Sequence, residues 1–322
     1  MDKLLKVKNL KTHFKTRKGI VKAVDGISFE LEKGEVLGIA GETGSGKSVA
    51  AKSIMRILPS NTAFSKADCL ELEGQNLLEL SKSDLKNIWG KKIAIIFQNP
   101  FSYINPLFSI GKQMSDVISF HEKINKKEAL KIASEMLHLV GMPNPKSILK
   151  YYPHELSGGM IQRVMIAMSL SCKPALLIAD EPTTALDVTV QAQILKLLND
   201  LRDKTSGIIL ITHNLAIILE ICNAIAVMYA GKLLEKGCVE DVIYKPSHPY
   251  TQGLLQAIPK LDGQEGKLKY VPGNIPSALN PPDGCRFSPR CPVSLPCCNH
   301  REPVLTEISP RHFVACHRVT RS

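Results

Sequence analysis

The sequence predicts an α/β domain with a largely parallel β-sheet, and two observations carry this prediction. Short apolar, β-branched runs with the length of buried strands recur along the chain, at residues 35–40, 92–97, 175–179, 207–212 and 224–230. Stretches with apolar residues at helical spacing lie between several of these runs, for example 47–58 and 188–201. Strands that alternate with helices in this way favour parallel pairing with helices on the sheet faces.

Three regions of the chain differ from this alternating pattern. Residues 1–33 alternate apolar and polar side chains, which predicts an antiparallel β layer at the edge of the sheet. From about 99 to 171 the strand pattern disappears, and residues 126–140 have helical spacing, so we expect a helical subdomain there. After about residue 261, Pro, Gly, Arg and Cys become dense. We therefore expect one domain over 1–261 and a loop-rich C-terminal extension over 262–322, which needs a staple or a docking surface.

The composition is that of a soluble globular protein. The chain has 322 residues, of which 44% are hydrophobic and 22% charged, so disorder and a disulfide-rich mini-protein are excluded. It contains no apolar run of the roughly 18–20 residues that span a bilayer. Its first residues carry frequent charges instead of the apolar stretch of a signal peptide. We expect a cytoplasmic location.

The chain is basic, with 41 Lys and Arg against 30 Asp and Glu and a formal charge of +11. An excess of this kind suggests an anionic partner, which could be a nucleotide, a nucleic acid or a membrane surface. Because the excess is spread along the chain, we favour a solvated basic face near a membrane. We expect no nucleic acid partner.

One segment fits the phosphate-loop pattern G-x-x-x-x-G-K-[ST] at every position: Gly41-Glu42-Thr43-Gly44-Ser45-Gly46-Lys47-Ser48. It follows an expected strand and opens an expected helix, which is the context that this motif requires. Glycines let backbone N–H groups turn toward phosphate oxygens, and the helix N-terminus adds a favourable dipole. Lys47 is expected to reach the β- and γ-phosphates, and the Ser48 hydroxyl is expected to bind Mg²⁺.

Two acidic residues, Asp180 and Glu181, follow the expected strand 175–179. A carboxylate at the C-terminal end of such a strand suits Mg²⁺, directly or through water. Glu181, one residue later, is expected to polarise the attacking water as general base. The chain therefore carries candidate groups for the hydrolysis of a nucleoside triphosphate.

A further motif, Leu156-Ser157-Gly158-Gly159-Met160, completes a pattern that resembles the ATP-binding cassette (ABC) ATPases. The resemblance covers about residues 4–260 and implies a P-loop NTPase fold with a RecA-like core. Four more positions match family motifs in the family order: Phe14 as the adenine-stacking aromatic, Gln98 as the Q-loop glutamine, Asp187 in the D-loop Ala185-Leu186-Asp187, and His213 as the switch histidine. The resemblance implies that Gln98 contacts Mg²⁺ or the water and that His213 holds the γ-phosphate.

The resemblance also implies partners. In the family, the Ser157-Gly158-Gly159 corner of one cassette contacts the ATP held by another, so this chain needs a second cassette. The residue pattern is closest to the ATPase subunits of oligopeptide, dipeptide and nickel importers, through residues 97–106, residues 247–251 and the Cys-rich tail. That subfamily implies a non-identical partner cassette, two membrane permease subunits and an extracytoplasmic solute-binding protein, with this chain peripheral on the cytoplasmic membrane face.

The tail concentrates five of the nine cysteines. Some members of the subfamily bind a [4Fe–4S] cluster through such a tail, which implies the ligands Cys285, Cys291, Cys298 and Cys316. Zinc bound by the same thiolates remains an alternative, as do free thiols, and Cys297 could replace Cys298. The Cys spacing contains no C-x-x-C ligand pair.

We expect an ATPase that energises an importer of peptides or related solutes. The alternative is a soluble ABC ATPase that acts on DNA or ribosomes, which only the positive charge favours. A third class, an iron–sulfur electron carrier, would leave the nucleotide motifs unexplained. Co-purification with multi-span membrane proteins, as opposed to ribosomes or DNA, separates the first two.

Overall fold

The computed structural model describes residues 2–184, 186–200, 202, 205–257 and 271–319. The chain divides into two compact units. Unit 1 contains residues 1–4, 32–34 and 79–209, and unit 2 contains residues 5–31, 35–78 and 210–322. Among the described residues, no helix combines the length and the apolar character needed to cross a membrane.

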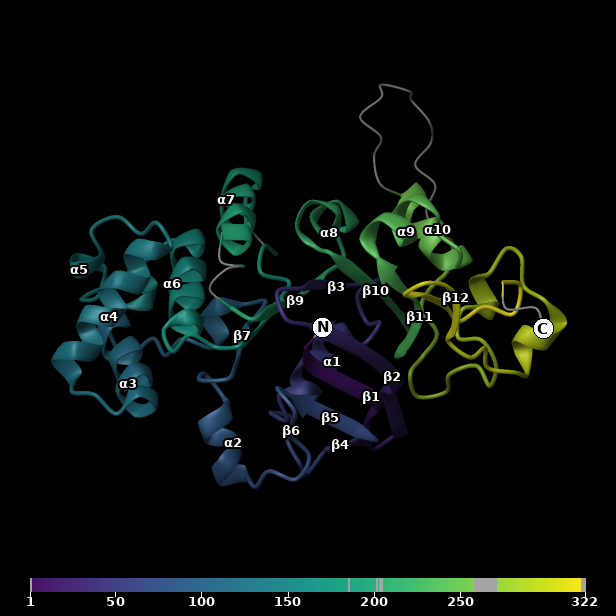
Figure 1. Cartoon of the computed structure of the whole chain (residues 1–322), viewed down its shortest axis with the longest axis horizontal. Coiled ribbons are helices and arrows are strands. Elements are labelled where there is room, and N and C mark those ends of the chain that lie inside the picture. The colour runs from purple at the N-terminus through teal and green to yellow at the C-terminus, as the bar shows by residue number, and fades with distance from the viewer. Residues whose placement is uncertain (1, 185, 201, 203–204, 258–270, 320–322) are drawn as a thin grey trace. The chain divides into compact units, whose positions relative to one another are not determined.

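Unit 1 contains a group of helices, including those that the sequence predicts between residues 99 and 171 (Figure 1). α4 shows why they form: Asn125 caps its first turn, and Ala129, Ala133 and Leu137 recur every four residues and are buried. The helices of the unit are α2 (Lys82–Ile88), α3 (Ile110–Glu122), α4 (Lys126–Leu139), α5 (Pro145–Ile148), α6 (Gly158–Leu170) and α7 (Val188–Asp200). Short 3₁₀ turns span Pro100–Ser102 and Pro153–Glu155.

The strands of unit 1 include a parallel pair, β7 (Ile93–Ile96) and β8 (Leu176–Asp180), in which every residue is buried. Their continuous apolar composition is typical of parallel strands covered on both faces. The parallel pairing agrees with the predicted α/β class. β9 (Gly207–Thr212) runs across the sequence boundary between the two units.

Unit 2 contains two sets of strands. In the first, the long strands β1 (Lys3–Thr16) and β2 (Gly19–Glu32) are neighbours, and β1 also pairs antiparallel with β4 (Ala63–Lys66) and β5 (Cys69–Leu72). β6 (Gln75–Asn76) follows β5. The antiparallel layer predicted for residues 1–33 is therefore larger than the alternation in those residues suggested.

The second set of strands in unit 2 has the order β12-β13-β11-β10-β3. β3 (Val36–Ala40) and β10 (Ala224–Tyr229) pair in parallel, and β11 (Lys232–Cys238) pairs antiparallel with β10. The extension supplies β12 (Thr306–Ser309) and β13 (His312–Val314), which pairs with β11. The helices of unit 2 are α1 (Lys47–Ile54), α8 (Leu215–Ile221), α9 (Val239–Tyr244) and α10 (Pro249–Gln256).

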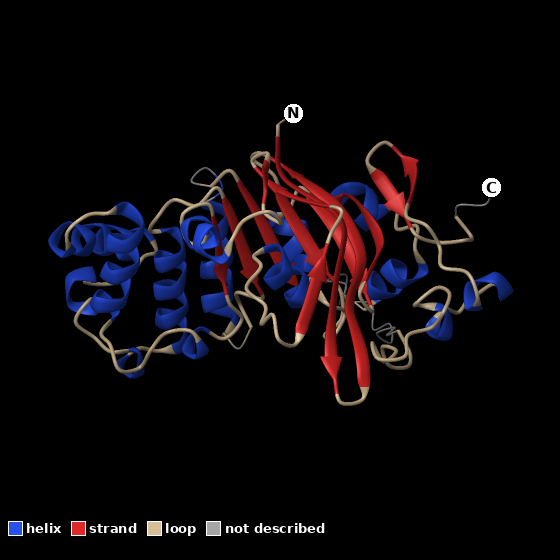
Figure 2. Cartoon of the chain, turned by 90° about the horizontal axis from the view of Figure 1, so that it is seen from below, coloured by secondary structure: helices blue, strands red, loops and turns tan. Residues whose placement is uncertain are grey.

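Over residues 271–319, the C-terminal extension is mostly loop, with 3₁₀ turns at Ser288–Arg290 and Pro296–Asn299 and one strand pair (Figure 2). It nevertheless contributes to a core. Cys285, Phe287 and Cys298 are buried in one apolar cluster with Tyr229 and Tyr250. The extension is thus docked on β10, β11 and α10 of the same unit, which is one of the two ways we expected a loop-rich tail to become stable.

Candidate nucleotide site

The phosphate loop joins the end of β3 to the start of α1 in unit 2. Its glycines Gly41, Gly44 and Gly46 have positive φ values of 149°, 86° and 103°. A Cβ on Gly41 would clash with the backbone oxygen of Met228, and one on Gly46 would clash with that of Ala23. Both positions therefore require glycine for two reasons, backbone conformation and space. Gly44 has nothing within 4 Å of the same point.

Lys47 is the first residue of α1, and its side chain is buried. Its Nζ donates hydrogen bonds to the carbonyl oxygens of Gly41 (2.6 Å) and Glu42 (3.0 Å). The Ser45 hydroxyl is fully buried and has no hydrogen-bond partner among the described residues. A fixed cation and the N-terminus of α1 give this loop a positive electrostatic character, which suits a polyphosphate.

The remaining predicted nucleotide-binding residues of unit 2 have different exposures. Thr43 and Gly44 are exposed and Ser48 is half-buried in the first turn of α1. Phe14 is half-buried near the end of β1, where it pairs with Ala63 of β4. His213 follows β9 and is exposed. The next residue, Asn214, caps α8 by accepting the N–H of Ala216 (3.0 Å).

In unit 1 the structure brings two of the predicted catalytic residues into contact. Gln98 Nε2 donates a hydrogen bond to Glu181 Oε2 (2.9 Å), and Thr184 Oγ1 donates to the same oxygen (2.9 Å). Glu181 has a positive φ of 47°, a conformation that is costly for a residue with a side chain and that clusters at functional sites. Two donors hold its carboxylate in one orientation, as a general base requires.

Asp180 is the last residue of β8 and is buried. With the Gln98 side-chain amide in the same unit, it supplies the hard oxygen donors that Mg²⁺ prefers. The Ser48 hydroxyl in unit 2 is a donor of the same kind. The chemistry of these side chains therefore suits Mg²⁺.

The predicted signature residues begin α6. Ser157 caps this helix, since its Oγ accepts the N–H of Met160 (3.4 Å). Gly158 has open space where a Cβ would stand, whereas a Cβ on Gly159 would lie 2.8 Å from Cγ1 of Val190 in α7. Asp187 is exposed, and its Oδ1 accepts the N–H of Val190 (2.9 Å). Ala185 of the predicted D-loop lies outside the described residues.

The four cysteines expected to bind a cluster lie near one another. Cys285, Cys298 and Cys316 are buried, Cys291 is half-buried and Cys297 is exposed. Burial, with a smaller contribution from the nearby Cys298, Cys316 and Cys291, raises the pKa of Cys285 to about 11. Cysteine thiolates are the ligands that a soft metal takes, and Cys298 is buried whereas Cys297 is exposed. Within the described residues, however, no three His, Cys, Asp or Glu side chains are arranged as a ready coordination shell.

Some residues that contact the predicted site carried no functional signal in the sequence. Thr184 bonds Glu181, and two residues of the C-terminal part, Tyr250 and Arg290, bond Glu42 of the phosphate loop. Tyr250 and Arg290 belong to stretches whose sequence pattern indicates a subfamily and not a role in the nucleotide site. The distance of more than 200 residues along the chain hides such contacts from any local pattern.

Comparison with known proteins identifies the chain. The model of the family described as ABC transporter matches residues 24–184. The chain belongs to the ABC transporter family. As the sequence predicted, it has the cassette ATPase fold and is an ATP-hydrolysing enzyme. A second family model, the oligopeptide/dipeptide transporter C-terminal region, matches residues 234–298.

Relatives resemble this ABC ATPase over almost its whole length. A probable peptide ABC transporter ATP-binding protein of Sinorhizobium fredii is 46% identical, over 98% of this chain and 95% of its own. The oligopeptide transport ATP-binding protein OppD of Bacillus subtilis is 46% identical, with 98% and 88% covered. The dipeptide transport ATP-binding protein DppD of that bacterium is 45% identical, with 98% and 95% covered.

Solved structures share the cassette fold. The dimeric ATP-binding cassette MJ0796, bound to ADP and phosphate, aligns with a TM-score of 0.65 at 24% identity, over 73% of this chain and 98% of its own. The CbiO1 protein of Clostridium perfringens, part of an ABC transporter complex, aligns with a TM-score of 0.62 at 28% identity, over 76% and 92%. The fold expected from the motifs is therefore confirmed.

Proposed function

We propose that this ABC ATPase energises a membrane importer of the dipeptide, oligopeptide or nickel type. The observation that carries the proposal is the match of residues 234–298 to the C-terminal region of oligopeptide and dipeptide transporters. The names of the relatives, which describe oligopeptide and dipeptide transport, support it. In this function the chain lies on the cytoplasmic face of the membrane and does not itself bind the solute.

The experiment is a pull-down of the tagged full chain from detergent-solubilised membranes of its own organism. Two multi-span membrane proteins and a second, non-identical cassette are expected to co-purify. Co-purification with ribosomes or DNA, and with no membrane protein, would overturn the transport proposal in favour of a soluble ABC ATPase. Uptake of labelled di- and oligopeptides and of nickel, compared with a strain that lacks the chain, identifies the solute.

We propose the following roles in hydrolysis. The loop Gly41–Ser48 and Phe14 bind ATP, with Lys47 on the β- and γ-phosphates. Ser48, Asp180 and Gln98 hold Mg²⁺, which neutralises phosphate charge when bound. Glu181 draws the proton of the attacking water, and His213 orients the γ-phosphate.

The signature corner and the D-loop act in the dimer of cassettes. We propose that Ser157, Gly158 and Gly159 contact the ATP of the partner cassette, and that Asp187 lies at the junction of the two. The open space around Gly158 supports this role, because a phosphate can approach the backbone there. ATP closes the two cassettes together and hydrolysis releases them.

Substitution of Glu181 by Gln tests the role of the base. The amide oxygen of Gln can still accept the bonds from Gln98 and Thr184, so the local structure is retained. A general base contributes roughly 10²–10⁴-fold to the rate, so phosphate release should fall by that factor while ATP stays bound. Unchanged hydrolysis would exclude Glu181 as the base.

We propose that the extension binds a [4Fe–4S] cluster through Cys285, Cys291, Cys298 and Cys316, with zinc on the same thiolates as the alternative. The presence of four such cysteines in the extension, and its resemblance to members of the subfamily that bind a cluster, support the proposal. Iron, sulfide and zinc analysis of anaerobically purified protein distinguishes the two metals. A metal-free protein with free thiols would refute both.

A further inference from the structure

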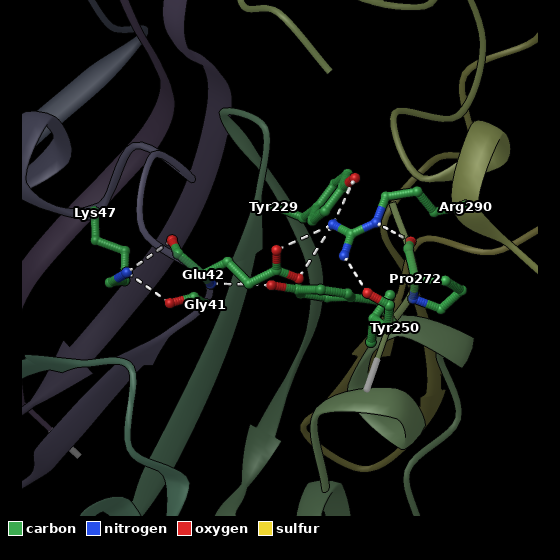
Figure 3. A network of polar contacts seen from close by, with 8 residues as sticks. Gly41, Glu42, Lys47, Tyr229, Tyr250, Pro272 and Arg290 are labelled. Atoms are coloured by element: carbon green, nitrogen blue, oxygen red, sulfur yellow. Dashed lines mark hydrogen bonds and ion pairs between the residues drawn. The ribbon is translucent and has the colours of Figure 1, made fainter. Parts of the chain in front are cut away.

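Two segments that the hydrolysis mechanism leaves unused meet at one residue of the phosphate loop. They are the segment His248–Thr251 at the start of α10 and the turn that ends in Arg290 and Cys291 in the extension. Both contact Glu42, the residue that follows the first glycine of the loop (Figure 3). All of these residues belong to unit 2.

Tyr250 holds the backbone of Glu42. Its hydroxyl accepts the N–H of Glu42 at 3.0 Å. The ring is fully buried and packs against the rings of Tyr229 (4.7 Å between centroids) and Phe287 (5.4 Å). The hydroxyl is therefore fixed in position, and Phe287 makes that position depend on the docked extension.

Arg290 holds the carboxylate of Glu42. Its Nη1 lies 3.1 Å from both carboxylate oxygens and 3.2 Å from the Tyr229 hydroxyl. Its Nε and Nη2 donate to the carbonyl oxygens of Pro272 and Val271, each at 2.8 Å. The side chain is only 5% exposed. A guanidinium engaged at all three nitrogens is rigid, and a Lys could not replace its fork of donors.

Glu42 is consequently held at three points. Arg290 binds its carboxylate, Tyr250 binds its N–H and Lys47 binds its carbonyl oxygen. Without Arg290, an unpaired carboxylate would remain in a loop that has to accept a polyanion. Repulsion between like charges would then weaken nucleotide binding, and the loop would lose a fixed point.

We propose that Arg290 and Tyr250 are positioning residues for nucleotide binding. The phosphate loop therefore depends on the docked C-terminal extension for its affinity for the nucleotide. Arg290 pairs with Glu42 so that the loop keeps its shape and its positive character. The inference rests on the proposed nucleotide role of the loop. Its consequence is that any change which undocks the extension lowers the affinity for ATP.

The test is a double-mutant cycle on the full chain, with the dissociation constant of the Mg²⁺ complex of a non-hydrolysable ATP analogue measured by calorimetry. Arg290→Met removes hydrogen bonds to the charged carboxylate of Glu42. Because one such bond can account for a tenfold change in affinity, we expect Arg290→Met to weaken binding of the analogue about tenfold. Glu42→Gln removes the carboxylate that needs pairing, so we expect a loss below about threefold. The double variant Glu42→Gln/Arg290→Met should bind about as well as Glu42→Gln alone.

Tyr250→Phe provides an independent variant that keeps the ring and removes one hydroxyl. It leaves the Glu42 N–H without its acceptor, and we expect a loss of about threefold or more. Arg311→Met is the matched control, because Arg311 also lies in the extension but pairs with Glu35, before β3, at the opposite end of that strand from the loop. Its affinity should equal that of the unaltered chain.

Two results would overturn the inference. One is an unchanged affinity in both Arg290→Met and Tyr250→Phe. The other is an equal loss from Arg290→Met with and without Glu42→Gln, since Arg290 would then act through the fold of the extension and not through the carboxylate. If the unaltered chain and Lys47→Ala bind the analogue equally, the proposed role of the loop fails instead. If Arg290→Met does not fold, Arg290→Lys takes its place in the cycle.

Discussion

Glu235 of β11 allows a precise prediction about how the extension is attached. Its side chain is fully buried and accepts three hydrogen bonds, from the N–H of Ser247 (2.8 Å), the N–H of His248 (3.0 Å) and Nε2 of His312 (2.8 Å). One carboxylate thus joins β11, the segment before α10 and β13 of the extension. Its removal leaves three donors, two buried and one half-buried, without an acceptor.

The magnitude follows from these three bonds. Breaking a buried pair by removing one partner costs about 3–5 kcal/mol, so Glu235→Ala should destabilise unit 2 by about 4 kcal/mol. Glu235→Gln keeps the size and one acceptor oxygen, but its NH₂ group faces a donor, and we expect about 2 kcal/mol. Glu240→Gln, an exposed acidic residue of α9, is the control and should change stability by less than about 0.5 kcal/mol.

Hydrogen exchange of the Ser247 and His248 amides, followed by mass spectrometry, measures the effect where it arises. A loss of about 4 kcal/mol corresponds to exchange that is faster by up to roughly 10³-fold, if local opening controls it. Urea unfolding of the same variants reports the effect on the whole chain. Unchanged protection of these two amides in a folded Glu235→Ala protein would refute the reasoning.

Two further predictions concern pH and glycine. Burial lowers the pKa of His248 to about 3, so the unfolded chain binds its proton first and stability should fall by up to about 1.4 kcal/mol per pH unit below pH 6.5. His248→Asn keeps an acceptor that can cap α10 but cannot take up this proton. In urea unfolding, the difference in free energy of unfolding between the unaltered chain and His248→Asn should therefore become smaller from pH 7 to pH 4.5. A difference that stays constant would contradict this. Gly46→Ala should cost well over 2 kcal/mol in thermal unfolding, because positive φ and a clash with Ala23 add, whereas Gly44→Ala meets open space and should cost only about 1–2 kcal/mol. Equal losses would show that space around Gly46 does not matter.

The local pattern of the sequence was sufficient to place the motifs that consist of consecutive residues at strand ends and helix starts. The phosphate loop, the Asp180-Glu181 pair and the Ser157 corner each depend on a strand end or a helix start, and the identity of the neighbouring residues specifies such points. The same holds for α4, whose apolar spacing predicts the helix that the structure contains. Most of the predicted strands and helices agree with the structure within a few residues for this reason.

Other elements were beyond the reach of local patterns. β4, β5 and β6 are two to four residues long, too short for alternation to distinguish them from loops. β12 and β13 lie in a Pro- and Cys-rich tail, where β13 pairs with β11 and β12 pairs with β13. Their strand character comes from the neighbouring strand and not from their own residues.

The sequence by itself determined the family, the ATPase activity and the residues of each motif. The reason is that the backbone conformation of each motif depends on the identity of a few consecutive residues. Only the tertiary structure decided which motifs touch. Gln98 meets Glu181 across 83 residues, and Arg290 meets Glu42 across 248. Contacts of this kind depend on how buried surfaces pack, which no spacing within the chain encodes, and they place the Cys-rich extension directly on the phosphate loop.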